Sequence, residues 1–152
     1  MVLVHENQIA EKRLPVNLRR LWYKLDRLFQ NRLGAVEYLT TDQYSVLRCI
    51  HEKTNEVFTQ TDISKLLGLH PNTITQICSK LEEKGLLTRF KVESDQRLKN
   101  INLTKQGYDT LVKHQPQAIA LQKLVINGLP KDDQSRFLDQ LQLLAEETDK
   151  LK

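Results

Sequence analysis

The sequence is poor in the residues that break helices and in those that form covalent or metal cross-links. Of 152 residues, five are glycine, four are proline and two are cysteine, and aromatic residues make up 6%. This composition argues against disorder and against a turn-rich all-β fold. Cys49, Cys78 and the four histidines show neither a disulfide framework nor metal-ligand spacing. We therefore expect a helix-rich protein with no metal site and no cofactor.

A long apolar run is also missing. The longest strongly apolar stretch near the N-terminus is residues 2–4, far shorter than the apolar region of a signal peptide or a membrane span. A chain of this length holds one domain with a core of its own. We expect a single domain over residues 1–152, no membrane partner and a cytoplasmic location.

Enzymatic signatures are absent as well. The chain has no glycine-rich phosphate loop, no nucleophile elbow and no paired carboxylates in an apolar setting, so we do not expect an enzyme. The formal net charge is +4, and basic residues outnumber acidic ones between residues 59 and 105. A positive middle segment is what a polyanion-binding surface needs, although many solvated surfaces share it.

What the sequence does contain is helical periodicity near both ends. Leucines recur at alternating steps of four and three from residue 14, which predicts a first helix with a packing seam. A long helix is expected from Thr104, kinked at Pro116, and a last helix from about Pro130 to Leu151. Because the leucine seam is too apolar to stay exposed on a monomer, we expect a homodimer. The predicted interface comprises Leu14, Leu18, Leu21, Leu25, Leu138, Leu141 and Leu144.

Capping boxes mark two helix starts in the middle of the chain. Thr40 with Gln43 predicts a helix that frays near residues 54–55, and Thr59 with Asp62 predicts a short helix that ends at Gly68. Pro71 fits the first turn of the next helix, which Gly85 ends. The two short helices and the turn between them form a helix-turn-helix. The apolar face of the second one comprises Ile74, Ile77, Cys78 and Leu81.

After the helix-turn-helix, the spacing of apolar residues changes from that of a helix to that of β-strands. Residues 86–92 are β-prone, residues 93–96 form a polar tip, and residues 97–103 alternate polar and apolar side chains as a returning strand does. A hairpin directly after the second helix is a wing.

The order and spacing of these motifs resemble the MarR (multiple antibiotic resistance regulator) family over roughly residues 14–150. The quoted segments are Asn-Thr-Ile-Thr at 72–75, Leu-Glu-Glu-Lys-Gly-Leu at 81–86, Asp-x-Arg at 95–97 and Ile-Asn-Leu-Thr-Lys-Gln-Gly at 101–107. The resemblance implies an α+β, mostly α fold. A winged helix-turn-helix core over about residues 36–107 is flanked by dimerisation helices at about 10–33 and 108–150.

The outer face of the second short helix suits reading of DNA bases. Asn and Gln can bind adenine through two hydrogen bonds, Thr can contact a thymine methyl group, and Lys80 suits a phosphate. The alternative is that these polar side chains are only solvated. The face comprises Asn72, Thr75, Gln76, Ser79 and Glu83, with Thr73 and Lys80 at its edge.

Other DNA contacts are expected from the wing and from the helix starts. The resemblance implies that Arg97 enters the minor groove while Asp95 orients its guanidinium, and a narrow A·T groove attracts arginine. The alternative for this pair is an ordinary surface ion pair. His70 stands where the family often has a small capping residue, so it either reaches a phosphate or is simply exposed. Further phosphate contacts are expected from Arg89, Lys91, Lys99, Thr59 and Thr61.

Together these features predict a repressor that binds double-stranded DNA as a homodimer, on a pseudo-palindromic operator with half-sites about 10 base pairs apart. The alternative is a winged helix used as a protein–protein interaction module. The resemblance also implies a crevice where relatives bind small aromatic or anionic effectors. Relatives that sense peroxide use a cysteine near the first helix, and residues 1–40 contain none. The candidate effector residues, which could equally be core or solvated side chains, are Arg19, Trp22, Tyr23, Tyr44 and Arg48.

Overall fold

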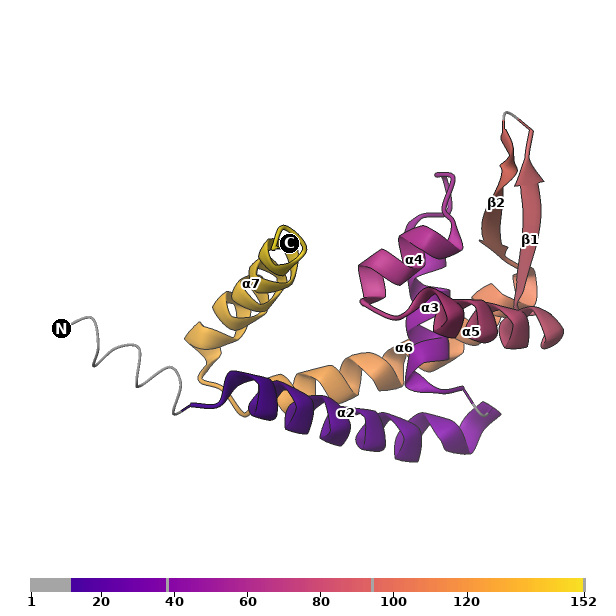
Figure 1. Cartoon of the computed structure of the whole chain (residues 1–152). Helices are drawn as coiled ribbons and strands as arrows, with labels where there is room; N and C mark the ends of the chain where they lie inside the picture. The colour runs from indigo at the N-terminus through magenta and orange to yellow at the C-terminus, as the bar shows by residue number, and fades with distance from the viewer. Residues whose placement is uncertain (1–11, 38, 94, 152) are drawn as a thin grey trace. The chain divides into compact units, whose positions relative to one another are not determined.

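The structure, a computed structural model, describes residues 12–151 except 38 and 94. Its helices and one two-stranded antiparallel sheet are an α+β, mostly α fold, which confirms the predicted fold class. The chain forms two compact units divided after Pro116. The elements of Figure 1 are α2 (Leu14–Glu37), α3 (Thr41–Glu52), α4 (Gln60–Leu67), α5 (Pro71–Glu83), β1 (Leu87–Val92), β2 (Asp95–Leu103), α6 (Lys105–Ile126) and α7 (Lys131–Thr148).

The start of α3 is capped as its sequence predicts. The Thr40 hydroxyl accepts the backbone N–H of Gln43 at 3.1 Å, and the Gln43 side chain accepts the backbone N–H of Thr40 at 3.2 Å. Each bond satisfies a donor that the helix leaves unpaired at its first turn. The helix ends at Glu52, two residues before the predicted fraying point.

The core of the first unit lies where α3, α4, α5 and the base of the hairpin meet. Leu47, Ile63, Ile74 and Leu81 are completely buried, and Ile101 is 1% exposed. These residues come from the apolar faces that helical and strand periodicity assign to the interior. Because the apolar face of α5 is buried in this core, the opposite face of α5 remains exposed.

The second strand of the hairpin is longer, and the turn at its tip shorter, than the sequence predicts. Strand β2 begins at Asp95, whereas the alternation of side chains places its start at Arg97, so that part of the prediction is wrong. The reason is a register shift between Lys91 and Val92, which brings Val92 opposite Asp95. An irregularity of this kind adds twist at the end of a hairpin and leaves no trace in the two-residue alternation.

The start of α6 is fastened to the end of α5. The Thr104 hydroxyl accepts the backbone N–H of Gly107 at 2.9 Å as an N-cap, and it donates to the carbonyl oxygen of Gly85 at 2.6 Å. The backbone N–H of Thr104 donates to the carbonyl oxygen of Leu86 at 3.1 Å. A Cβ added at Gly107 would lie 1.8 Å from that same oxygen. We call the contacts of Thr104 and Gly107 with residues 85–86 the clamp.

The second unit consists of the part of α6 after Pro116 and of α7. Ala118 and Leu121 are buried, whereas none of the α7 residues is. Because α7 ends at Thr148, the prediction that Leu151 lies on this helix is wrong. None of the helices in the described ranges is long and apolar enough to cross a membrane.

Candidate DNA-binding surface

Helix α5 has one buried and one exposed face. The exposed face carries Asn72, Thr75, Gln76 and Lys80, while Thr73 and Ser79 are half-buried at its edges. The hydroxyl of Thr75 donates to the carbonyl of Pro71 at 3.0 Å, which leaves its methyl group and its acceptor lone pairs for an outside partner. These six residues of the predicted face, like the exposed Glu83, therefore lie at or beside the exposed face.

His70 caps α5 with its ring, which the sequence reasoning missed. The ring Nδ1 accepts the backbone N–H of Asn72 at 3.2 Å. In neutral histidine the proton then lies on Nε2, because an accepting ring nitrogen carries none. The ring is exposed, so the Nε2–H is a donor suited to a phosphate oxygen. The sequence does contain the signal for this cap: a side chain with a hydrogen-bond acceptor stands directly before a proline that suits the first helical position.

The turn and the start of α4 hold α5 in place. Gly68 adopts a left-handed conformation with φ 63°, and the Ser64 hydroxyl donates to the carbonyl of Leu69 at 2.7 Å. At the start of α4 the Thr59 hydroxyl donates to the Asp62 carboxylate at 2.7 Å. Hydrogen bonds from Thr59 lower the pKa of Asp62 below its usual value. The Thr59 side chain is therefore engaged in capping, and the exposed Thr61 is the neighbour open to solvent.

The wing places two positive charges directly opposite each other. Lys91 and Lys99 are cross-strand partners, so their exposed side chains share one face of the hairpin. Like charges in this position are destabilising unless an anion lies between or beside them. This arrangement makes the hairpin a surface that favours a polyanion.

The tip of the wing is ordered by a different bond from the one expected. The Asp95 carboxylate accepts the backbone N–H of Arg97 at 2.9 Å. In the described part of the chain the Arg97 guanidinium makes no ion pair and is exposed. Asp95 therefore fixes the backbone of the tip, and the arginine head is available to a groove or a phosphate.

Arg89 connects the wing to α5. Its guanidinium forms an ion pair with Glu82 through two donor nitrogens and lies 3.5 Å from the Ser79 hydroxyl. This hydrogen-bonded pair lowers the pKa of the Glu82 carboxyl. Both Arg89 and Ser79 are on the expected surface, but they are already engaged with each other and with Glu82. The sequence offered no sign of this pair, whose members lie seven residues apart on a helix and a strand.

All but one of the predicted dimer residues are exposed in the single chain. The exposed fractions of Leu14, Leu18 and Leu21 on α2 are 53%, 43% and 38%, and Leu25 is half-buried. On α7 the three predicted leucines are likewise exposed. Helices α2 and α7 thus each present an apolar face that is partly exposed to solvent. The α7 residues are Leu138, Leu141 and Leu144.

The predicted effector residues do not form one pocket. Trp22 lines a cavity of about 330 Å³ together with Ser45 and Leu67. Tyr44 is 4% exposed and packs against Phe29, with ring centroids 5.2 Å apart. The remaining three lie outside that cavity: Arg19 and Tyr23 are exposed on α2, and Arg48 is paired with Glu52 at 2.8 Å. Among the described residues no cluster of side chains could hold a metal ion.

Comparison with known proteins agrees with the geometry. Residues 39–99 match the model of the MarR family. The HTH-type transcriptional regulator Hpr of Geobacillus sp. (strain WCH70) is 25% identical over 125 residues, which cover 82% of this chain and 61% of that protein. The chain thus spans under two thirds of the length of that relative.

Solved structures resemble the chain over most of its length. The structure of CouR from Rhodococcus jostii RHA1 bound to p-coumaroyl-CoA is 26% identical with a TM-score of 0.76, covering 87% of this chain and 91% of that one. The S. aureus MepR–DNA complex is 20% identical with a TM-score of 0.78, covering 88% and 96%.

Proposed function

We propose that this chain is a MarR-family homodimeric repressor that binds duplex DNA at a pseudo-palindromic operator; residues 39–99 match the model of that family. The observation that supports this most strongly is the exposed face of α5, whose side chains are mainly uncharged hydrogen-bonding groups. It is accompanied by the opposed Lys91–Lys99 pair and by the exposed head of Arg97. Base reading and phosphate binding need these two kinds of surface.

A dimer gives the two apolar helix faces their cover. Packing of the α2 and α7 leucines against a second copy would remove them from water, at about 25 cal/mol for each Å² of apolar surface. Twofold symmetry would present two α5 helices to successive major grooves, with half-sites about 10 base pairs apart. The related Hpr protein is named as an HTH-type transcriptional regulator, which supports regulation as the role and not catalysis.

Replacement of Arg97 by alanine is expected to weaken operator binding by about 1–3 kcal/mol, with most of the loss at A·T-rich flanks. The Asp95 carboxylate already orders the backbone at Arg97, so the tip has little backbone freedom left to lose on binding. Titration of labelled operator at fixed salt measures the change. The matched variant Arg97→Lys should fall between the two, because it keeps the charge and loses the planar donor fork. Equal affinity of the wild type and of Arg97→Ala for the operator would show that the wing arginine does not contribute to DNA binding.

Contacts that position the protein can be separated from contacts that read bases. Lys99→Ala should lower affinity for all sequences alike and reduce the slope of log affinity against log salt by roughly one unit. Gln76→Ala should relax the preference at one or two base pairs and leave that slope nearly unchanged. Affinities measured at several salt concentrations on operator and unrelated DNA decide this. If Gln76→Ala lowers the salt slope and Lys99→Ala relaxes base preference, the assignment of the exposed α5 face to base reading is wrong. If the wild type binds no DNA, the protein-interaction alternative is favoured.

Relief of repression is proposed to come from a small aromatic or anionic effector and not from oxidation. CouR, which shares the fold, was solved with p-coumaroyl-CoA bound. Both cysteines are buried, and burial raises the pKa of Cys49 to about 11 and that of Cys78 above its usual value. Thiols with raised pKa remain protonated at neutral pH and react slowly with oxidants.

A double variant Cys49→Ser, Cys78→Ser is therefore expected to bind and release DNA as the wild type does, with peroxide affecting neither. Gel-shift titrations with and without peroxide give the comparison. Peroxide that releases the wild type but leaves the double variant bound would show a redox switch instead.

A further inference from the structure

Helix α2 has three sides with different surroundings. The leucine seam is the first side. On the second side Phe29 is buried and the Asp26 carboxylate accepts the Thr41 hydroxyl at 2.5 Å, so this side faces the start of α3. The third side lies about 120° around the helix from the seam and is exposed. Its bases, which follow each other at steps of four and three and which we call the basic strip, are Arg20, Lys24 and Arg27.

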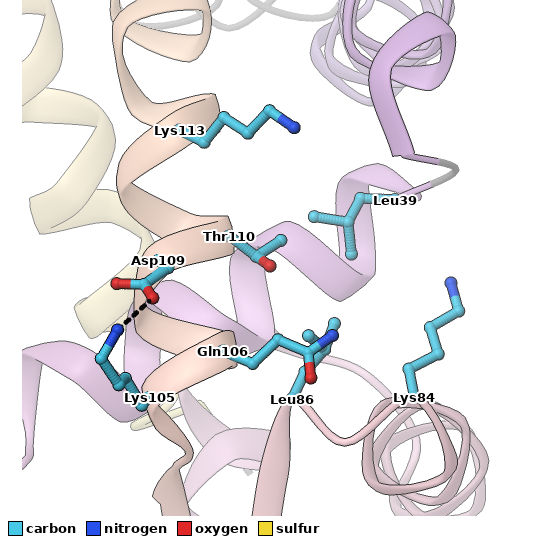
Figure 2. Close-up of a pocket in the computed structure, with 8 residues that line it drawn as sticks. All are labelled: Leu39, Lys84, Leu86, Lys105, Gln106, Asp109, Thr110 and Lys113. Atoms are coloured by element: carbon cyan, nitrogen blue, oxygen red, sulfur yellow. Dashed lines mark hydrogen bonds and ion pairs between the residues drawn. The ribbon is translucent and has the colours of Figure 1, made fainter.

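The basic strip has no acidic neighbour among the described side chains of α2, because Asp26 faces α3. On other helices an exposed base can pair with a carboxylate one turn away, as Figure 2 shows for Lys105 and Asp109 at 2.9 Å. In the described part of the chain Arg20 and Lys24 make no such pair. Like charges three or four residues apart on a helix repel each other, so the strip destabilises α2 unless an anion lies over it.

The head group of the third base is held in place from one side. The guanidinium carbon of Arg27 lies over the Tyr23 ring, 5.9 Å from the ring centroid. This cation–π contact uses the face of the guanidinium and none of its N–H donors, which remain suited to anionic oxygen atoms. The strip therefore combines three positive charges with one partly ordered donor fork.

The anion that fits the strip is a phosphate backbone. The three bases span about 10 Å along the helix axis, and the phosphates of one DNA strand follow each other about every 3.4 Å along the duplex axis. A helix that enters a lipid surface needs apolar side chains on the side that enters, and a stable protein interface needs an apolar centre. The strip itself has neither, whereas phosphate contacts need only charge and hydrogen-bond donors.

The strip is separate from the surface proposed to hold the operator. That surface is carried by α5 and the hairpin, whereas α2 packs against α3. Within the first unit the hairpin extends away from α2 (Figure 1). A duplex held by α5 and the wing therefore leaves the strip open to another polyanion.

We propose that the basic strip binds the backbone of a second DNA duplex, so that the chain bridges two segments of DNA. The strip offers phosphate contacts and no base contacts, so the second duplex is bound whatever its sequence. This bridging goes beyond operator binding, and it rests on the proposed function because α5 and the wing hold the first duplex.

A capture experiment tests the bridge. Operator duplex is tethered to a surface, loaded with the full chain and washed, and a labelled duplex of unrelated sequence is then added at about 50 mM salt, where phosphate contacts are strong. The wild type should retain the labelled duplex. The triple variant Arg20→Gln, Lys24→Gln, Arg27→Gln should stay on the operator but retain at least about tenfold less labelled duplex for each chain, because three phosphate contacts are lost.

Two further variants separate the charge of the strip from the fold and from the net charge. Arg20→Lys with Arg27→Lys keeps the charges and should bridge as the wild type does. The charge-matched triple variant Lys123→Gln, Lys131→Gln, Arg136→Gln changes exposed bases of α6 and α7 outside the strip and should also bridge normally.

Retention of the labelled duplex by the glutamine variant of the strip at the wild-type level would overturn the proposal. So would a wild-type chain that holds the operator and captures no second duplex, including one whose strip instead binds phosphatidylserine vesicles. A wild-type chain that the operator does not hold would contradict the proposed function. In that case binding of the labelled duplex in solution decides the strip, and equal affinity of wild type and strip variant would overturn it.

Discussion

Gly107→Ala should destabilise the folded chain by about 3 kcal/mol or more, near the upper end of the range for overpacked sites. A Cβ at this position would lie 1.8 Å from the carbonyl oxygen of Leu86 and 2.8 Å from its carbonyl carbon. Both atoms belong to the backbone, so no side chain can move aside to make room. The first turn of α6 would have to separate from residues 85–86, which breaks the clamp and frees the end of α5.

Urea denaturation at fixed protein concentration measures this loss, and Gly68→Ala is the matched control. Gly68 has φ 63° and no atom within 4 Å of its would-be Cβ, so alanine there costs only the left-handed conformation, about 1 kcal/mol. DNA affinity should fall in the Gly107 variant even below its unfolding midpoint, because the angle of α5 is no longer fixed. Equal stability of the two variants would show that the clamp does not hold the fold together.

Leu21→Asp is expected to give a monomer or an aggregate and to lower operator affinity by at least about a hundredfold. The charge would lie in the proposed seam of α2, where burial of an unpaired carboxylate costs several kcal/mol. A monomer retains one α5 and one wing, so it loses the gain that comes from engaging two half-sites at once.

The control is Val16→Asp on the same helix. Val16 is 57% exposed and lies about 140° around the helix from Leu21, away from the seam. It should sediment as a dimer and bind DNA as the wild type does. A stable dimer with Leu21→Asp would show that the α2 seam is not the interface.

The helix starts and the buried faces could be predicted because their causes are local. The capping boxes at Thr40 and Thr59 need only a side chain and an N–H three residues apart, and the apolar face of α5 needs only the helical period. The direction in which Asn72 and Gln76 point follows from that face. The register shift at Val92 in the wing could not be predicted in this way, because it depends on how two strands pair.

Features that join distant residues could not be predicted. The ion pair between Arg89 and Glu82 needs the angle between β1 and α5, which no spacing encodes. Gly107 was visible only as a glycine in a family motif, and the reason for it appears once the carbonyl of Leu86 is in contact.

Selection of preferred sites from a pool of random duplex DNA, using the purified chain, tests the central claim most directly. We expect a pseudo-palindrome whose half-sites are centred about 10 base pairs apart, with A·T-rich positions at the flanks where Arg97 is expected. Twofold symmetry in the selected sequence would support the dimer and base reading by α5 in one result. A selected pool without enrichment, or with a single asymmetric half-site, would contradict the account.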